Sequence, residues 1–181
     1  MNKLSKIISA PFSRFRRDED ANITVGFVIM FPIMITMFMA SFEIGLLMTR
    51  QVMLDRAVDV TIRSLRMGEI PGADQDTLRT IICDRASIIP DCSANLLIEL
   101  RPVSTSPWAD LAGSSTTCIN RDEDIELPTV NAGAPQEVML VRVCSVFDPI
   151  FPTSTLGIQF NTDEFGGYAL VSTSAFVNEP S

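Results

Sequence analysis

The chain has 181 residues, enough for one domain of ordinary size together with a membrane element. It contains no histidine, which excludes Ser-His-Asp and Cys-His catalysis as well as histidine metal ligands. Residues 1–20 carry five basic and three acidic side chains, whereas the other 161 residues carry nine basic and 19 acidic side chains. The acidic charge of this larger part argues against nucleic acid as a partner, because a phosphate backbone requires a basic surface.

The first predicted element is a membrane-spanning helix. Residues 23–48 read ITVGFVIMFPIMITMFMASFEIGLLM, with Glu43 as the only charged side chain. A helix of this length spans about 39 Å, which is enough to cross a hydrocarbon core of ~30 Å with some tilt. A cleavable secretory signal has a shorter apolar region that ends at a small-residue site. The sequence therefore predicts a retained, single-pass anchor in the lipid bilayer.

The orientation of this helix follows from the residues on either side of it. Basic side chains before the helix favour a cytoplasmic N-terminus, which places the chain after residue 48 outside the cytoplasm. All four cysteines lie in that later part: Cys83, Cys92, Cys118 and Cys144. Their even number predicts two disulfides in an oxidising compartment, with four buried free thiols as the alternative. A zinc site is disfavoured because no two cysteines have the short separation that such sites use.

The helix is predicted to continue beyond the membrane as an amphipathic stalk. Apolar or small side chains recur at spacings of three, four or seven and form one stripe: Leu47, Leu54, Val58, Thr61 and Leu65. Gly68 provides the stop, and Pro71 and Gly72 support it. The stripe is covered either by the chain's own head domain or by a partner protein.

The rest of the chain predicts a small head of mixed structure. A short helix begins with Asp74 as its N-terminal cap. Three strand-like segments follow, at residues 96–101, 137–147 and 168–177. The second of these is almost continuously apolar, as in a central strand that is covered on both faces.

The fold class is therefore α+β, with a long N-terminal transmembrane helix and stalk packed against a small antiparallel sheet. We expect three regions: a basic cytoplasmic leader (1–21), the transmembrane helix and stalk (22–68), and an extracytoplasmic, disulfide-braced head (69–181). The pairing Cys83–Cys92 and Cys118–Cys144 is favoured, because the first bond closes a loop around Pro90 and the second ties a segment to the long strand. All three connectivities remain open at this point.

Motifs that carry chemistry are nearly absent. The sequence has no glycine-rich phosphate loop, no nucleophile elbow and no cluster with metal-ligand spacing. The acidic stretch at residues 120–126 has the charge of a calcium loop but lacks the glycine that an EF-hand requires, so a solvated loop is favoured. We therefore predict no catalytic residue, no cofactor and no metal.

The start of the apolar helix resembles a known family. Residues 16–27 read RRDEDANITVGF, in which a basic leader, an acidic patch and a small residue precede the apolar run. The pattern continues through Phe31-Pro32, Glu43, the stalk helix, its closing Gly68 and the final SAFVNEP stretch. Over most of its length the chain resembles the TadE/TadF-like pseudopilins of tight-adherence (Flp/Tad) systems.

The resemblance implies a processing site at the membrane entry. Aligning Phe27 with the family's phenylalanine places Ala21 at the last position of the leader, so that cleavage falls between Ala21 and Asn22. Gly26 stands where the family has a glutamate that is thought to guide processing and to pair with a neighbour's N-terminal amine. An uncleaved signal anchor is the alternative.

Glu43 is the remaining candidate residue. An ionisable side chain within a membrane span is costly and marks a functional contact, so we expect a polar contact with a partner. Because Glu43 lies only five residues before Met48, the alternative is that its side chain reaches the outer interface.

The resemblance implies a non-catalytic pseudopilin or pilus assembly component of a tight-adherence secretion system. Such a protein sits in the bacterial inner membrane and presents its head to the periplasm. The implied partners are other pilin or pseudopilin helices, the assembly platform with its ATPase, and a prepilin peptidase. The alternative function is a membrane-tethered periplasmic module that binds a small ligand or a cell-wall component.

Overall fold

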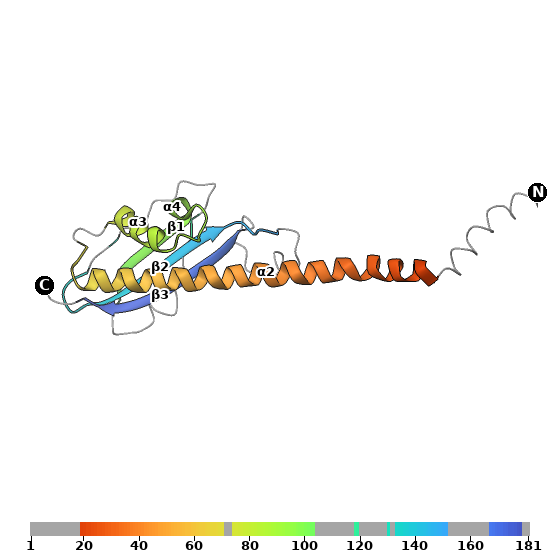
Figure 1. Ribbon diagram of the computed structural model, residues 1–181. Coiled ribbons are helices and arrows are strands. Elements are labelled where there is room, and N and C mark those ends of the chain that lie inside the picture. Colours follow the sequence, from red (N-terminus) through yellow and green to blue (C-terminus); the bar gives the residue numbers. More distant parts are fainter. Residues whose placement is uncertain are drawn as a thin grey trace, which may run out of the picture. The chain divides into compact units, whose positions relative to one another are not determined.

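The computed structural model describes residues 19–70, 74–103, 118–119, 130, 133–151 and 167–178, with side chains from residue 23 onward (Figure 1). The chain consists of two compact units, Met1–Phe42 and Glu43–Ser181, and each is considered by itself. Its elements in chain order are α2 (Glu19–Arg66), α3 (Gln75–Arg85), α4 (Cys92–Asn95), β1 (Leu96–Val103), β2 (Val138–Phe147) and β3 (Tyr168–Val177). A long apolar N-terminal helix and a small three-stranded antiparallel sheet give the α+β arrangement that the sequence predicts.

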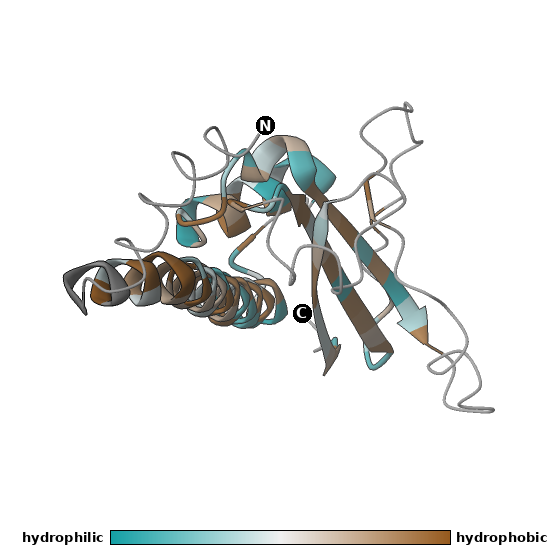
Figure 2. Cartoon of the chain, turned by 90° about the vertical axis from the view of Figure 1, so that its right-hand side faces the viewer, coloured by the Kyte–Doolittle hydropathy of each residue, from teal (hydrophilic) through white to brown (hydrophobic). Residues whose placement is uncertain are grey.

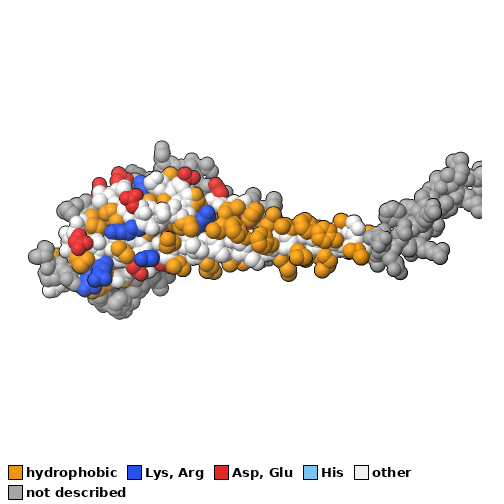
Figure 3. Space-filling view, viewed as in Figure 1, with side chains coloured by type: hydrophobic (Ala, Val, Ile, Leu, Met, Phe, Trp, Pro, Cys, Tyr) orange, Lys and Arg blue, Asp and Glu red, His pale blue; other side chains and the backbone are white. Residues whose placement is uncertain are grey.

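In the unit Met1–Phe42, α2 exposes apolar side chains on every face. All residues from 23 to 34 are exposed, including Ile23 at 77% and Phe27 at 64%. Figure 3 shows the resulting apolar surface along the N-terminal part of α2. The Thr36 hydroxyl donates to the Ile33 carbonyl at 2.9 Å, so its polar group is satisfied inside the helix. Within the described residues, α2 is the helix that is long and apolar enough to cross a membrane.

The unit Glu43–Ser181 has its core between the C-terminal half of α2 and the sheet. Four buried side chains of α2 recur at helical spacing: Leu54, Ala57, Val58 and Ile62. They share one cluster with buried residues of α3 and of the strands, including Leu78, Ile82, Ile98, Leu100, Met139, Val141 and Val143. Figure 2 shows α2 and α3 on the same side of the sheet. Of the five residues in the predicted stripe, Leu54, Val58 and Thr61 are buried, and Leu47 and Leu65 are partly buried.

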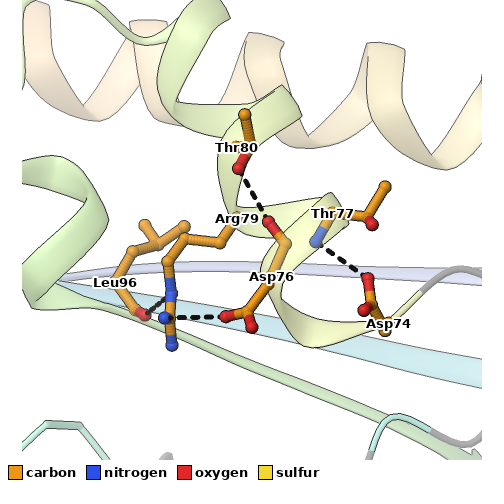
Figure 4. Close-up of polar contacts among 6 residues, drawn as sticks. All are labelled: Asp74, Asp76, Thr77, Arg79, Thr80 and Leu96. Carbon is orange, nitrogen blue, oxygen red and sulfur yellow. Dashed lines mark hydrogen bonds and ion pairs between the residues drawn. The ribbon is translucent and has the colours of Figure 1, made fainter.

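Local polar contacts fix the position of α3 (Figure 4). Asp74 caps the helix, since its side chain accepts a hydrogen bond from the Thr77 N–H at 2.9 Å. Hydrogen bonding with Thr77 holds the pKa of Asp74 below its usual value. At the other side of the helix, Arg79 donates from Nε to the Leu96 carbonyl at 3.2 Å and pairs with Asp76 at 3.3 Å. The cap predicted at Asp74 is therefore present, and Arg79 connects α3 to the start of β1.

The sheet has the strand order β1-β2-β3, and both pairings are antiparallel. β2 is the central strand, and nine of its ten residues are buried, which agrees with its apolar sequence. Register aligns Ile98 with Val143 and Val143 with Ser172, so these three side chains share the face that meets the helices.

β1 ends at Val103, two residues beyond the predicted end at Arg101, so that Pro102 lies within the strand. The carbonyl of Leu96 points away from β2, because it accepts the hydrogen bond from Arg79. Backbone groups alternate along an antiparallel strand, so the even-numbered residues of β1 all point outward. The nitrogen of Pro102 therefore lies on the open edge, where the missing N–H costs no ladder bond.

Two disulfides brace this unit. Cys83 of α3 is bonded to Cys92 at the start of α4, with Cα atoms 5.7 Å apart. Cys118 is bonded to Cys144 of β2, with Cα atoms 5.3 Å apart. This connectivity is the one favoured from the sequence, and among the described residues no cysteine is free.

The core predicts a sharp contrast between two residues of α2. Leu54→Ala removes a fully buried side chain, and the cavity should lower the free energy of unfolding by about 3 kcal/mol. Val52→Ala removes a side chain that is 64% exposed on the same helix, so the loss should stay below about 0.5 kcal/mol. Denaturant unfolding of the full chain in detergent, followed by near-ultraviolet circular dichroism, measures both. Equal losses in the two variants would contradict the assignment of the inner face.

Candidate functional site

Glu43, the only charged residue of the predicted membrane segment, is buried against the sheet. It is 2% exposed and lies at the start of the second unit. The Tyr168 hydroxyl donates to its Oε1 at 3.3 Å, and the Phe151 N–H donates to the same oxygen at 3.4 Å. Tyr168 begins β3 and Phe151 follows β2, so both donors come from one end of the sheet. These contacts offset the cost of burying a carboxylate, which is several kcal/mol when no partner is present.

Phe147 connects this carboxylate site to Arg50. The rings of Phe147 and Tyr168, which are cross-strand partners, meet edge to face with centroids 6.0 Å apart. The guanidinium carbon of Arg50 lies 4.6 Å from the centroid of the Phe147 ring, in a cation–π contact. Arg50 follows Glu43 by seven residues, two helical turns, so both reach the sheet from one face of α2. We call Glu43, Arg50, Phe147, Phe151 and Tyr168 the boundary cluster.

Burial controls the electrostatics of the boundary cluster. It raises the pKa of Tyr168, and the charge of Glu43 and its hydrogen bond raise that pKa further. Burial also lowers the pKa of Arg50 from its usual value. A raised tyrosine pKa means that the fold favours the protonated hydroxyl. The resulting stabilisation is present below about pH 10 and is lost as the pH rises through the folded-state pKa of Tyr168.

The contacts of the boundary cluster hold side chains in place. Tyr168 is a protonated donor to a carboxylate, and Arg50 rests on an aromatic ring, so neither is arranged as a nucleophile beside a base. In the part of the chain that the structure describes, no three His, Cys, Asp or Glu side chains gather in a way that suits a metal ion. The arrangement fixes the rotation of α2 against the ends of β2 and β3.

The structure places the other predicted site residues as follows. Gly26 lies on the exposed apolar part of α2, where an added Cβ would meet no atom within 4 Å. Ala21 and Asn22 fall in the first turns of α2, which begins at Glu19, but their side chains lie outside the described residues. Glu43 has hydrogen-bond partners in its own chain, and its contact with another protein stays a prediction.

Sequence reasoning did not identify Tyr168, Phe147 or Arg50 as partners of Glu43. Two signals in the sequence pointed toward them. Tyr168 is the only tyrosine of the chain, and it stands at the first position of a predicted strand. Arg50 is the first cation after the apolar run and has the spacing from Glu43 that places both on one helix face.

Comparisons of the chain with protein-family models, with curated proteins and with solved structures found no match.

The boundary cluster predicts a change in the titration of Tyr168 when the Glu43 charge is removed. In Glu43→Gln the repulsion between the carboxylate and the tyrosinate is lost, so the pKa of Tyr168 should fall toward its ordinary value while burial keeps it raised. Because the chain has one tyrosine, the near-ultraviolet absorbance of tyrosinate reports on Tyr168 alone.

The matched control is Glu69→Gln, which removes an exposed carboxylate just beyond α2. This control should leave the tyrosine titration where it is in the unsubstituted chain. If Glu43→Gln also leaves the titration unchanged, the Glu43–Tyr168 contact does not exist in solution.

Proposed function

We propose that the chain is a non-catalytic pseudopilin, or a pilus assembly component of the same kind, in a tight-adherence type secretion system. It sits in the bacterial inner membrane as a single-pass protein, with its N-terminus in the cytoplasm and its head in the periplasm. The assignment to a tight-adherence system rests on the resemblance of residues 16–27 to the start of TadE/TadF-like pseudopilins. The remaining support comes from the continuous helix α2, the two disulfides and an exposed apolar stripe on α2.

The observation that carries the proposal is that the exposed apolar helix continues into the core of the head. α2 runs without interruption from Glu19 to Arg66. Its first part is apolar on every face, and its last part supplies Leu54 and Val58 to the core of the head. A protein that only needed a tether could use any apolar segment and a flexible linker. A helix that continues into the core instead suits a subunit whose head is built directly on its apolar helix.

The disulfides support the periplasmic placement of the head. Both bonds lie in the unit that follows the apolar segment. Disulfides persist in oxidising compartments such as the bacterial periplasm and are rare in the cytosol. Together with the basic leader, they favour a cytoplasmic N-terminus.

An exposed apolar stripe on α2 supports a contact with other pilin helices. Ile44, Met48 and Val52 follow one another at intervals of four residues on α2. They are 36%, 61% and 64% exposed. Apolar residues at this spacing form a stripe along one face of a helix, and such a stripe suits packing against a second helix.

The proposed topology is tested with a reporter enzyme that is active only in the periplasm. Fused after Ser181, the reporter should be active, because the basic leader keeps the N-terminus inside. The same reporter fused after Asp18, before the apolar segment, should be inactive. A well-expressed but silent fusion at Ser181 would overturn both the placement of the head and the disulfide argument.

Processing is tested by intact-mass analysis of the chain extracted from cells with an active prepilin peptidase. Cleavage should remove residues 1–21 and leave Asn22 as the new N-terminus. Ala21→Leu should block cleavage, because a pocket for a small side chain excludes leucine, whereas Ala21→Gly should be cleaved. Gly26→Glu restores the residue that the resembling family has, and the open space around Gly26 admits it, so cleavage should become more complete.

If the unsubstituted chain keeps the mass of residues 1–181, the proposed role of the protein changes. The protein would then be a fixed assembly factor or a tethered binding module rather than a subunit that enters a pilus. Continued cleavage of Ala21→Leu would show that a different bond is cut.

A further inference from the structure

One edge of the sheet presents backbone groups that the described part of the chain leaves without hydrogen bonds. β3 is an edge strand, and the Val171 carbonyl accepts a hydrogen bond from Gln51 of α2 at 3.1 Å. Asn178, just after β3, exchanges hydrogen bonds with Gln136 and Glu137 on the β2 side. Odd-numbered residues of β3 therefore point their N–H and C=O groups away from β2. Among the described residues, nothing bonds to the outward backbone groups of 173, 175 and 177.

This edge also lacks the features that normally prevent pairing with another chain. Its ten residues, YALVSTSAFV, include no charged side chain and no proline. The opposite edge strand, β1, carries Glu99, Arg101 and Pro102. Charges and prolines on an edge strand discourage a further strand from joining the sheet. The two edge strands of this sheet therefore differ, and β3 is the one that lacks charged side chains and proline and can pair with a further strand.

A groove lies beside the same half of β3. It has a volume of about 570 Å³ and is formed by Ala175 and Phe176 together with the last turns of α2. Ile62, Met67 and Phe176 give it apolar walls, and Asp59, Arg63 and Arg66 supply its charges. Arg63 is exposed, and it places a cation at the groove in a chain whose net charge is −8. Figure 3 shows basic side chains over this C-terminal end of α2.

The open edge of β3 and the groove beside it together suit an extended polypeptide as the ligand. Open N–H and C=O groups in a row are matched by the backbone of another strand, as in recognition by strand addition. The apolar walls suit apolar side chains of such a segment. The exposed guanidinium of Arg63, which forms no ion pair with a described residue, suits a carboxylate.

A second copy of this chain does not fit the edge. Two β3 strands related by a twofold axis would run antiparallel, so their Tyr168 ends would point in opposite directions. Glu43 contacts Tyr168, and the apolar segment precedes Glu43 directly. Copies anchored in one bilayer enter it from the same end, which excludes this pairing, and this step rests on the proposed function.

We propose that the edge of β3 from residue 173 to residue 177, with the groove beside it, binds an extended segment of a partner protein as a fourth strand. A carboxylate-bearing side chain of that segment pairs with Arg63. Apolar side chains of the segment contact Ile62 and Phe176.

The test uses short synthetic peptides of alternating threonine and valine, each with one glutamate at a different position. The full chain in detergent micelles should bind at least one of them, and the lysine counterpart of that peptide should bind at least about tenfold more weakly. Arg63→Glu should remove this preference for glutamate. Arg56→Glu, an exposed arginine two turns earlier on α2, should leave it intact.

Strand pairing is tested on the peptide side, so that the fold of the protein is not disturbed. N-methylation of one set of alternate peptide amides should abolish binding, and methylation of the other set should not. The amide protons of Thr173, Ala175 and Val177 should exchange with solvent more slowly in the complex.

Three results would overturn the proposal: no binding by any glutamate peptide, equal binding of both methylated sets, or binding unchanged by Arg63→Glu. These results do not depend on membrane topology or on cleavage of the leader. Failure here is therefore distinguishable from failure of the proposed function.

Discussion

The packing of α2 against the sheet is the interaction on which the head depends. A sheet of three strands needs a cover for its apolar face, and the short helix α3 supplies only Leu78 and Ile82 among the buried residues of the cluster. Leu54, Val58 and Ile62 of α2 provide much of the remaining cover. Each such side chain contributes about 1.5–3 kcal/mol when it is buried. The long apolar helix α2 is therefore also a structural element of the domain that follows it.

The same dependence gives Glu43 its importance. Glu43 follows the exposed apolar part of α2 and is the residue at which the second unit begins. An apolar residue at this position would leave the Tyr168 hydroxyl without its carboxylate partner. Arg50 and Phe147 add a contact two turns further along α2. The boundary cluster thus holds Glu43 and Arg50 of α2 against one end of the sheet.

The elements of this fold are largely predictable because their signals are local. The cap at Asp74, the apolar stripe of α2 and the continuous apolar run of β2 each depend on residues close in sequence. The one-turn helix α4 was missed because four residues carry no periodicity, and Pro102 masked the true end of β1. The partners of Glu43 were not predictable, since Tyr168 lies 125 residues away and no short-range pattern encodes that contact. The sequence favours this disulfide connectivity because the first bond closes a loop around Pro90 and the second ties a segment to the long strand, and the structure contains that connectivity.

The distance along the chain between Glu43 and Tyr168 also orders the events of folding. α2 is synthesised before every strand that it packs against, and β3 is synthesised last. The Cys83–Cys92 bond closes a separation of nine residues and can form while the sheet is still incomplete, whereas Cys118–Cys144 spans 26. Contacts between residues far apart in sequence slow folding, because their closure entropy is lost before the contacts form. During that interval the inner face of α2 lacks the cover that the sheet provides, and transiently exposed apolar surface of this kind promotes aggregation.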